Sequence, residues 1–337
     1  MDQDLVADQS RVAALSAEIP TLYCPSPIRT DEHLASHIDN LLLDWIGPIG
    51  IYRGEHRMLR ESSFGRLVML CYPDAHDADR LLLAAQCLGA LFAVDDYYGD
   101  DIHRGAVPTL VAPRLSLALA ALEPAYLVEP YSTALGTALN ADPVLVGLNA
   151  YLQRVQALAT PSQVARVRHE IIAVFVTMTS EAAFRILGST QAIYEYLAQR
   201  QVNSFMPCLS LIDVVGGYEL PANIYASQKV RRASVLAASA TSIVNDLYSC
   251  SKESVAEIGN FNLPQLLTAE RGCSHKEAVA LSAEMHDALM CEYEHTEREL
   301  LQNATVELTR YLGGLRAWMA GNLEWHRTSG RYRVEQA

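Results

Sequence analysis

Apolar residues recur at intervals of three and four positions along most of this 337-residue chain, which is the spacing of one face of an α-helix. Strict alternation over the length of a β-strand is hard to find, and the abundant Ala and Leu both favour helices. Clear helical faces comprise Leu34, Ile38, Leu41, Leu42 and Trp45; Leu81, Leu82, Ala85, Leu88, Leu91, Phe92 and Asp95; and Val235, Leu236, Ser239, Ile243 and Asp246. The pattern predicts an all-α protein.

Glycine and proline residues divide the chain into predicted helices of about 10–25 residues. Ser274, three residues before Glu277, is typical of a capping box at the start of a helix. No break is long enough to be a linker between domains. We therefore expect one helical domain over residues 31–337, preceded by an extended, proline-containing arm over residues 1–30.

Half of the residues are apolar and 19% are charged, so the chain can bury a large core. Its 26 basic and 39 acidic residues give a net charge of −13. This balance argues against a nucleic-acid partner, which requires a basic surface, and against electrostatic docking on anionic lipid. Such an acidic protein binds an anionic ligand only where metal ions or clustered arginines supply positive charge.

The seven cysteines have long, irregular spacings without a C-x-x-C pair, which is typical of free thiols in a reducing compartment. The acidic start, Met1-Asp2-Gln3-Asp4, lacks the basic and apolar segments of a secretory signal. The longest uncharged apolar stretch, residues 81–94, is shorter than the roughly 20 residues of a membrane span. We therefore predict a cytoplasmic protein without a membrane span.

A cluster of carboxylates follows the most apolar predicted helix in the first third of the chain. Asp95, Asp96, Asp100 and Asp101 lie around Gly99. Acidic side chains are unfavourable at the C-terminal end of a helix, where the helix dipole is already negative, so a cation must compensate them. The cluster is either a solvated turn, which Gly99 suits, or a metal site.

A second polar pattern lies 150 residues further along the chain. Asn245, Ser249 and Glu253 are spaced by four residues, so on a helix they form one stripe of oxygen ligands. Hard oxygens suit Mg²⁺, and Mg²⁺ sites with few protein ligands usually add phosphate oxygens and water. A polar end of an amphipathic helix is the alternative, but the full pattern N-D-x-x-S-x-x-x-E arises by chance in roughly 0.2% of chains this long.

The two motifs together resemble the metal-binding motifs of class I terpene synthases, and the resemblance extends over nearly the whole chain. It implies a single-domain α-helical bundle with a central active-site cavity, and three Mg²⁺ ions around a diphosphate. The implied metal ligands are Asp95 with Asp96 or Asp100 for two ions, and Asn245, Ser249 and Glu253 for the third.

Further residues resemble the diphosphate-binding positions of that family. Arg200 lies 45 residues before Asn245, where the family has a diphosphate-sensing arginine. The resemblance places Asn203 and Ser204 in the linker and effector positions after it. It implies that the diphosphate accepts hydrogen bonds from Arg200, Lys252 and the C-terminal pair Arg331 and Tyr332. The residues expected to carry catalysis are Asp95, Arg200, Asn245, Arg331 and Tyr332.

Several segments, among them Leu22 to Pro25, Phe64 to Leu67 and Ala93 to Tyr98, resemble the 2-methylisoborneol and 2-methylenebornane synthase group of the family. That resemblance implies a C11 substrate, 2-methylgeranyl diphosphate, and a bornane-type product. Capture of water by the final cation would yield an alcohol, and loss of a proton would yield an alkene. The family often forms homodimers, so a homodimer is compatible with the resemblance.

Aromatic rings stabilise cations through their π faces, so each aromatic residue near the motifs is a candidate for the wall of the cavity. The candidates are Phe92, Phe205 and Trp325, and ordinary core packing is the alternative for each. Other readings of the whole chain are a cyclase of geranyl, farnesyl or geranylgeranyl diphosphate, a chain-elongating prenyl transferase, and a non-catalytic helical protein that binds diphosphate. A prenyl transferase usually carries two D-D-x-x-D motifs and basic residues for a second diphosphate, whereas the second motif here is of the Asn/Ser/Glu type and lysine is scarce.

Overall fold

The computed structural model of the chain describes residues 19–203, 205–253 and 262–332, and every regular element in these ranges is a helix. The longer helices are α2 (Glu32–Ile49), α5 (Ala78–Val94), α6 (Pro108–Leu122), α7 (Tyr131–Ala141), α8 (Pro143–Leu158), α9 (Pro161–Leu187), α14 (Gln228–Glu253), α16 (His275–Leu301) and α17 (Val306–Thr328). The shorter α-helices are α3 (His56–Ser62), α4 (Phe64–Cys71), α10 (Ile193–Arg200), α11 (Met206–Leu209), α12 (Ile212–Val215), α13 (Ala222–Tyr225) and α15 (Leu263–Arg271). The prediction of an all-α fold is confirmed.

The ends of the long helices follow from local sequence chemistry. The hydroxyl of Thr160 accepts from the backbone N–H of Gln163, whose side chain accepts in return from the N–H of Thr160, so α9 begins with a capping box. Gly188 ends α9 with a φ of 61°, a left-handed conformation that glycine adopts without strain. The capping box predicted at Ser274 and Glu277 is confirmed at the start of α16.

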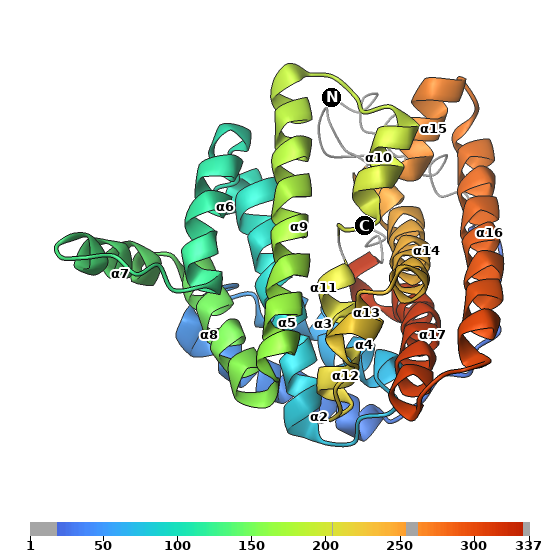
Figure 1. Cartoon of the computed structure of the whole chain (residues 1–337). Helices are drawn as coiled ribbons and strands as arrows, with labels where there is room; N and C mark the ends of the chain where they lie inside the picture. Colours follow the sequence, from blue (N-terminus) through green and yellow to red (C-terminus); the bar gives the residue numbers. More distant parts are fainter. Residues whose placement is uncertain (1–18, 204, 254–261, 333–337) are drawn as a thin grey trace.

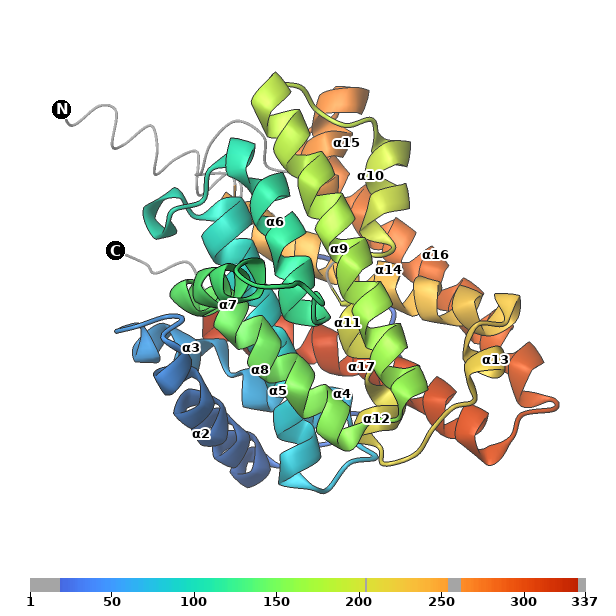
Figure 2. The ribbon, with the colours of Figure 1, turned by 60° about the vertical axis from the view of Figure 1, so that its left-hand side comes forward.

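The helices form a bundle around a group of short central segments (Figure 1). α9 packs against α6 and α8 on one side of the molecule, and α14 packs against α16 and α17 on the other (Figures 1 and 2). The short helix α11 contacts α5, α9 and α14, so it lies between the two halves. α7 projects from the bundle next to α8, and none of its residues is buried.

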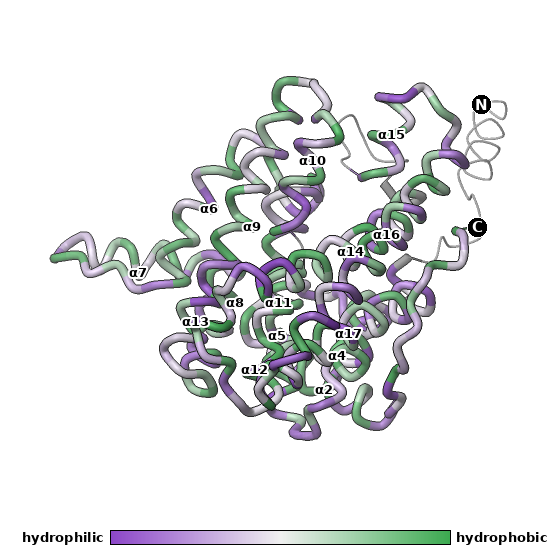
Figure 3. Tube along the Cα trace, turned by 45° about the vertical axis from the view of Figure 1, so that its right-hand side comes forward, coloured by the Kyte–Doolittle hydropathy of each residue, from purple (hydrophilic) through white to green (hydrophobic). Residues whose placement is uncertain are grey.

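Most of the buried apolar side chains belong to one large cluster contributed by helices from α2 to α17. A smaller cluster under α10, α15 and α16 includes Ile193, Leu247 and Leu267, and Leu22 from the segment before α2 joins it. Apolar and polar residues are interspersed along the helices, as expected when one face of each helix is buried and the other is exposed (Figure 3). All seven cysteines are free, as the sequence predicts.

One segment, Ala78–Asp100, is long and apolar enough to cross a membrane by composition alone. In the bundle, 72% of its most apolar 18-residue window is buried. This segment is α5 with the turn that follows it, and it packs against α2, α4 and α8. Its apolar character is therefore that of a core helix.

Two irregularities shape the centre of the bundle. α5 continues directly into a π-helical turn, η1 (Asp95–Asp100), in which the N–H of Asp101 reaches back to the carbonyl oxygen of Asp96 at 3.0 Å. π-Helical turns are often found at functional sites. The second irregularity is the break between α10 and α11, where Pro207 lies in the first turn of α11 and its missing N–H is not needed.

Candidate active site

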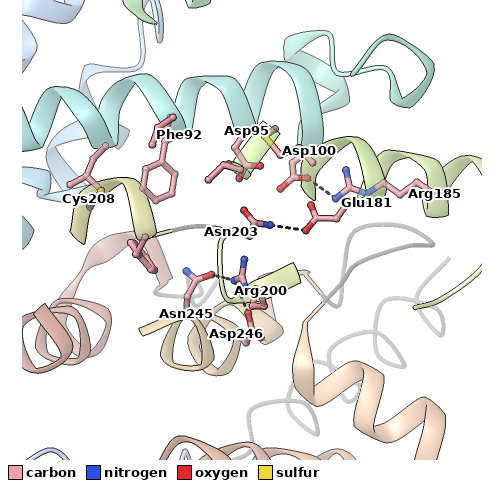
Figure 4. A pocket seen from close by; sticks show the side chains of 15 residues that line it. Phe92, Asp95, Asp100, Glu181, Arg185, Arg200, Asn203, Cys208, Asn245 and Asp246 are labelled. Carbon is pink, nitrogen blue, oxygen red and sulfur yellow. Dashed lines mark hydrogen bonds and ion pairs between the residues drawn. The ribbon is translucent and has the colours of Figure 1, made fainter. Parts of the chain in front are cut away.

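A cavity of about 140 Å³ lies where η1, α9, α14 and the break after α10 meet. Its apolar wall consists of Leu88, Leu91, Phe92, Val174, Met178, Phe205 and Cys208. Its polar wall consists of Asp95, Asp100, Glu181, Arg185, Arg200, Asn203, Asn245 and Asp246. Figure 4 shows Phe92 and Cys208 at one end and Asp100, Glu181 and Arg185 at the other. Such a cavity separates a place for an apolar chain from a place for a charged group.

The π-helical turn directs two carboxylates of the first motif into this cavity. Asp95 and Asp100 both line it, opposite Arg200 and Asn245 (Figure 4). Surrounding protein desolvates Asp95, and this effect, followed by the nearby charges of Asp100 and Asp96, raises the pKa of Asp95 well above its usual range. The turn therefore concentrates negative charge that a cation would relieve.

Asp96 is not among the residues that line the cavity. Its Oδ2 accepts a hydrogen bond from the hydroxyl of Tyr52 at 2.7 Å, and the guanidinium groups of Arg104 and Arg331 lie 3.8 and 3.7 Å from its oxygens. Because Asp96 already has these partners, Asp100 rather than Asp96 is the second carboxylate of the motif at the cavity.

Asp100 is paired with a residue of α9. Arg185 donates through Nη2 to Asp100 Oδ1 and through Nη1 to the carbonyl oxygen of Gly99, both at 2.6 Å. Arg185 therefore ties the end of η1 to α9, and it brings positive charge to the polar end of the cavity. Part of the compensation that the acidic cluster requires, that of Asp100, is supplied by an arginine 85 residues away in sequence.

The second motif lies on α14, where Asn245 belongs to the opposite wall of the cavity and Ser249 is not among the lining residues. Asn245 accepts through Oδ1 from Arg200 Nη2 at 2.9 Å, and its Nδ2 lies 3.2 Å from Nε2 of His326. Ser249 is one turn further along, and its buried hydroxyl oxygen has no hydrogen-bond partner in the part of the chain that the structure describes. Lys252 and Glu253 continue α14, but their side chains lie outside the described part of the structure.

Arg200 lies beside the second motif, across the cavity from Asp95 and Asp100, and Asp246 fixes its position (Figure 4). Its Nη2 lies 2.7 Å from Asp246 Oδ1, and the hydroxyl of Tyr196 donates to the other oxygen of Asp246 at 2.6 Å. Burial by itself would lower the pKa of Arg200, but the charge of Asp246 raises it overall, so Arg200 is a permanent cation. Among the described residues, its buried Nε has no hydrogen-bond partner. The arginine is thus oriented and still has a donor available.

Asn203 also lines the cavity and donates through Nδ2 to Glu181 Oε1 at 2.8 Å. Ser204 lies outside the described residues. Arg331 is not among the described residues that line the cavity, but its guanidinium carbon lies 4.4 Å from the centre of the ring of Phe92, which does line it. The backbone of Tyr332 belongs to the short helix η3 (Gly330–Tyr332), but its side chain is outside the described part.

Comparison with known proteins identifies the family. Residues 86–292 match the family described as "Terpene synthase family 2, C-terminal metal binding". The chain is 35% identical to the 2-methylisoborneol synthase of Streptomyces griseus over 314 residues, which are 92% of this chain and 71% of the relative. This chain is a class I terpene synthase.

The synthase also resembles solved structures over nearly its whole length. Its fold matches 2-methylisoborneol synthase from Streptomyces coelicolor A3(2) in complex with Mg²⁺ and 2-fluoroneryl diphosphate, with a TM-score of 0.88 and 32% identity over 94% of this chain and 98% of that one. It is 30% identical to the bonnadiene synthase of Allokutzneria albata, over 94% of this chain and 86% of the relative. The resemblance inferred from the motifs is confirmed.

The aromatic candidates of the synthase divide into two kinds. Phe92 and Phe205 line the cavity. Trp325 does not: it is fully buried, and its Nε1 donates to the carbonyl oxygen of Ser62 at 2.8 Å. The Trp325 ring lies 6.2 Å from that of Phe64, which in turn stacks on Phe92 at 5.1 Å. The expectation that Trp325 belongs to the wall is therefore corrected, because Phe64 lies between it and Phe92.

The sequence did not identify Glu181, Arg185 or His326 as residues of the site. It also did not predict that Asp246 would hold Arg200 in place. A signal for the first two was present, since Val174, Met178, Glu181 and Arg185 follow at helical spacing and line one cavity. Two charged residues that continue an apolar stripe of a long helix indicate a polar end of a pocket. For His326 no comparable signal exists, because its role depends on contact with α14.

Burial sets the protonation of two of these groups. It raises the pKa of Glu181 to about 7, against the opposing charge of Arg200. It lowers the pKa of His326 to about 3, and the nearby charges of Arg331 and Arg200 act in the same direction. His326 is therefore a neutral ring at physiological pH, and Glu181 is a carboxyl group close to its titration point.

Proposed function

We propose that the synthase ionises and cyclises an acyclic allylic diphosphate with release of diphosphate, and that this substrate is 2-methylgeranyl diphosphate. The product would be a C11 bornane-type compound, 2-methylisoborneol or 2-methylenebornane. The observation that carries the proposal is a cavity in which the carboxylates of η1 face Asn245 and Arg200 at one end, with an apolar wall at the other. The similarity to 2-methylisoborneol synthases over most of the chain supports the choice of substrate.

The oxygen ligands around the cavity fit Mg²⁺. Within the described residues no cluster of three or more His, Cys, Asp or Glu side chains could hold a metal by itself, so phosphate oxygens and water must complete the coordination. The raised pKa of Asp95 and the unpartnered hydroxyl of Ser249 both indicate a site that gains from a cation. We assign Asp95 and Asp100 to two ions and Asn245, Ser249 and Glu253 to a third. When bound, Mg²⁺ supplies electrostatic stabilisation of the departing diphosphate.

The chain's own cations have the complementary role. Arg200 lines the cavity beside Asn245, and Arg331 lies against Phe92, another residue of the lining. A guanidinium fork binds phosphate oxygens in a bidentate way, which suits both positions. Lys252 and Tyr332 would add donors, and Asn203 and Ser204 would link the movement of Arg200 to the cavity. These donors stabilise negative charge as it develops on the leaving group.

The apolar wall then receives the hydrocarbon chain and its cation. Phe92 and Phe205 present aromatic rings, while Leu88, Val174 and Met178 exclude water and constrain the chain to a folded conformation. Holding the chain folded favours ring closure, because the reacting carbons are kept close together. The last step is capture of one water molecule or loss of one proton.

A second candidate is a cyclase of geranyl, farnesyl or geranylgeranyl diphosphate. The chain is 30% identical to a bonnadiene synthase and 35% identical to a 2-methylisoborneol synthase. Because a relative named for a different product is almost as similar, the second candidate has support. Both candidates use the same polar end of the cavity, and they differ in the length of chain that the apolar wall accepts.

The test is a parallel incubation of the purified synthase and Mg²⁺ with geranyl, 2-methylgeranyl, farnesyl and geranylgeranyl diphosphate. Products are identified by gas chromatography and mass spectrometry, with EDTA-treated protein as the control. We expect a dominant cyclic C11 product, whose mass separates alcohol from alkene. A dominant C10, C15 or C20 cyclic product would establish the second candidate instead. Absence of any product would contradict both.

A further inference from the structure

His326 connects α17 to the ligand motif of α14 through hydrogen bonds whose directions are determined by the partners. Arg200 Nη2 donates to Asn245 Oδ1 at 2.9 Å, and a guanidinium has no acceptor. The oxygen of the Asn245 amide therefore faces Arg200, and its nitrogen faces Nε2 of His326 at 3.2 Å. On the other side of the ring, Nδ1 of His326 lies 2.8 Å from the backbone oxygen of Asn322.

These partners leave one arrangement of protons on the ring. The carbonyl oxygen of Asn322 only accepts, so Nδ1 of His326 carries the proton and donates it. Nε2 then keeps its lone pair and accepts from the Nδ2–H of Asn245. Rotating the amide by half a turn would set its NH₂ group against Arg200 and its oxygen against the lone pair of Nε2. Both ends of the amide are therefore held.

The ring of His326 is itself held by packing. The side chain is 1% exposed, and its ring centre lies 4.8 Å from that of Trp325 and 6.2 Å from that of Phe205, both nearly perpendicular. The ring of Tyr248 lies 5.8 Å away on α14. His326 is not among the residues that line the cavity. It is a fixed acceptor behind the wall, whereas Arg200 is exposed to whatever occupies the cavity.

We infer that His326 is a positioning residue, which keeps Asn245 Oδ1 directed into the cavity toward a divalent cation when the diphosphate of the substrate draws Arg200 away. This inference rests on the proposed function, which assigns Asn245 to a metal ion. Arg200 has acceptors that compete with Asn245, since Asp246 lies at 2.7 Å and phosphate oxygens would enter beside it. Partners that orient a ligand side chain in this way tune metal affinity without touching the metal.

The experiment compares two substitutions of similar size. His326→Gln keeps an oxygen that can accept from the Asn245 amide, and His326→Leu removes the acceptor. Binding of inorganic pyrophosphate with Mg²⁺ is measured by isothermal titration calorimetry, which needs no turnover. We expect His326→Leu to weaken this binding by about 10-fold or more and His326→Gln to weaken it by less than about 3-fold. With substrate, the Mg²⁺ concentration for half-maximal rate should rise in the same order.

A matched control is His286→Leu. His286 is also a buried histidine, but it lies on α16, bonds Asp287 at 2.9 Å and does not line the cavity. Its replacement should leave pyrophosphate binding as in the wild type. Wild-type binding by His326→Leu, or an equal loss in the Leu and Gln variants, would overturn the inference.

A measurement on the wild-type protein does not depend on the folding of any variant. Nitrogen-15 NMR of labelled histidine reports which ring nitrogen carries the proton. We expect Nδ1 of His326 to be protonated and Nε2 to be bare, both before and after Mg²⁺ and pyrophosphate are added. A proton on Nε2 in either state would overturn the inference, even if the synthase proved to act on none of the four diphosphates. Normal protonation with no turnover would instead contradict the proposed function alone.

Discussion

The guanidinium of Arg331 lies over the ring of Phe92, with 4.4 Å between its central carbon and the ring centre. The same group is 3.7 Å from Asp96. A residue near the end of the chain thus meets both the aromatic wall of the cavity and the first acidic motif. Because Asp96 lies close to the guanidinium of Arg331, the two residues link the C-terminal segment to the first acidic motif beside the cavity.

Replacement of Arg331 by Met should lower turnover by about 100-fold or more, which corresponds to about 3 kcal/mol of transition-state stabilisation. The substitution removes a phosphate donor but keeps an apolar contact with Phe92. Steady-state kinetics with the preferred diphosphate provide the measurement. Arg327→Met is the matched control, because Arg327 is 67% exposed and pairs with Glu324. Equal effects of the two substitutions would contradict a role of Arg331 in catalysis.

Asn245→Ala and Glu253→Ala should each abolish turnover and leave the helical content unchanged. Each removes one oxygen ligand of the third ion, whereas α14 keeps its apolar contacts with α16 and α17. Product formation by gas chromatography and far-ultraviolet circular dichroism are the two readouts. Full activity in both variants would refute the assignment of metal ligands on α14.

Glu181→Gln should change how stability depends on pH in metal-free protein. Burial raises the pKa of Glu181 to about 7, so the folded wild type resists ionising this group while the unfolded chain ionises it near its usual pKa. The contribution of Glu181 to stability is therefore lost as the pH rises from about 4.5 to about 7. The Gln variant should escape this loss, on the order of 1–2 kcal/mol after allowance for solvent in the cavity.

Thermal unfolding in EDTA at pH 5 and pH 8 measures this effect. The melting temperature of Glu181→Gln relative to wild type should be higher at pH 8 than at pH 5. Gln keeps an oxygen that can accept from Asn203, so that hydrogen bond is preserved in the comparison. A difference in melting temperature that is the same at both pH values would mean that Glu181 does not titrate as proposed.

Phe92→Leu and Trp325→Phe should affect different properties: the first should change the ratio of products, and the second should lower the stability of the fold. Phe92 lines the cavity, so its loss should change the ratio of products. Trp325 donates to the carbonyl oxygen of Ser62 behind the wall, so Trp325→Phe should cost about 1 kcal/mol of stability and leave the product ratio unchanged. Product analysis and thermal unfolding of both variants test this division. A changed product ratio in Trp325→Phe would mean that Trp325 does belong to the wall of the cavity.

The sequence by itself determined the helical class, the start of α16 and the presence of two oxygen-rich motifs. These are local properties. Apolar spacing of three and four reports the buried face of a helix, and a spacing of four places Asn245, Ser249 and Glu253 on one stripe wherever that helix packs. The family resemblance followed from the same local patterns.

The tertiary structure decided which side chains of those motifs meet. The π-helical turn directs Asp95 and Asp100 into the cavity. Asp96 instead accepts a hydrogen bond from Tyr52 and lies close to Arg331. Packing of α9 and α17 brings Glu181, Arg185 and His326 to the site, and it places Phe64 between Trp325 and Phe92. Contacts between segments far apart in sequence depend on how helices break and pack, and a local pattern carries no information about its distant partner.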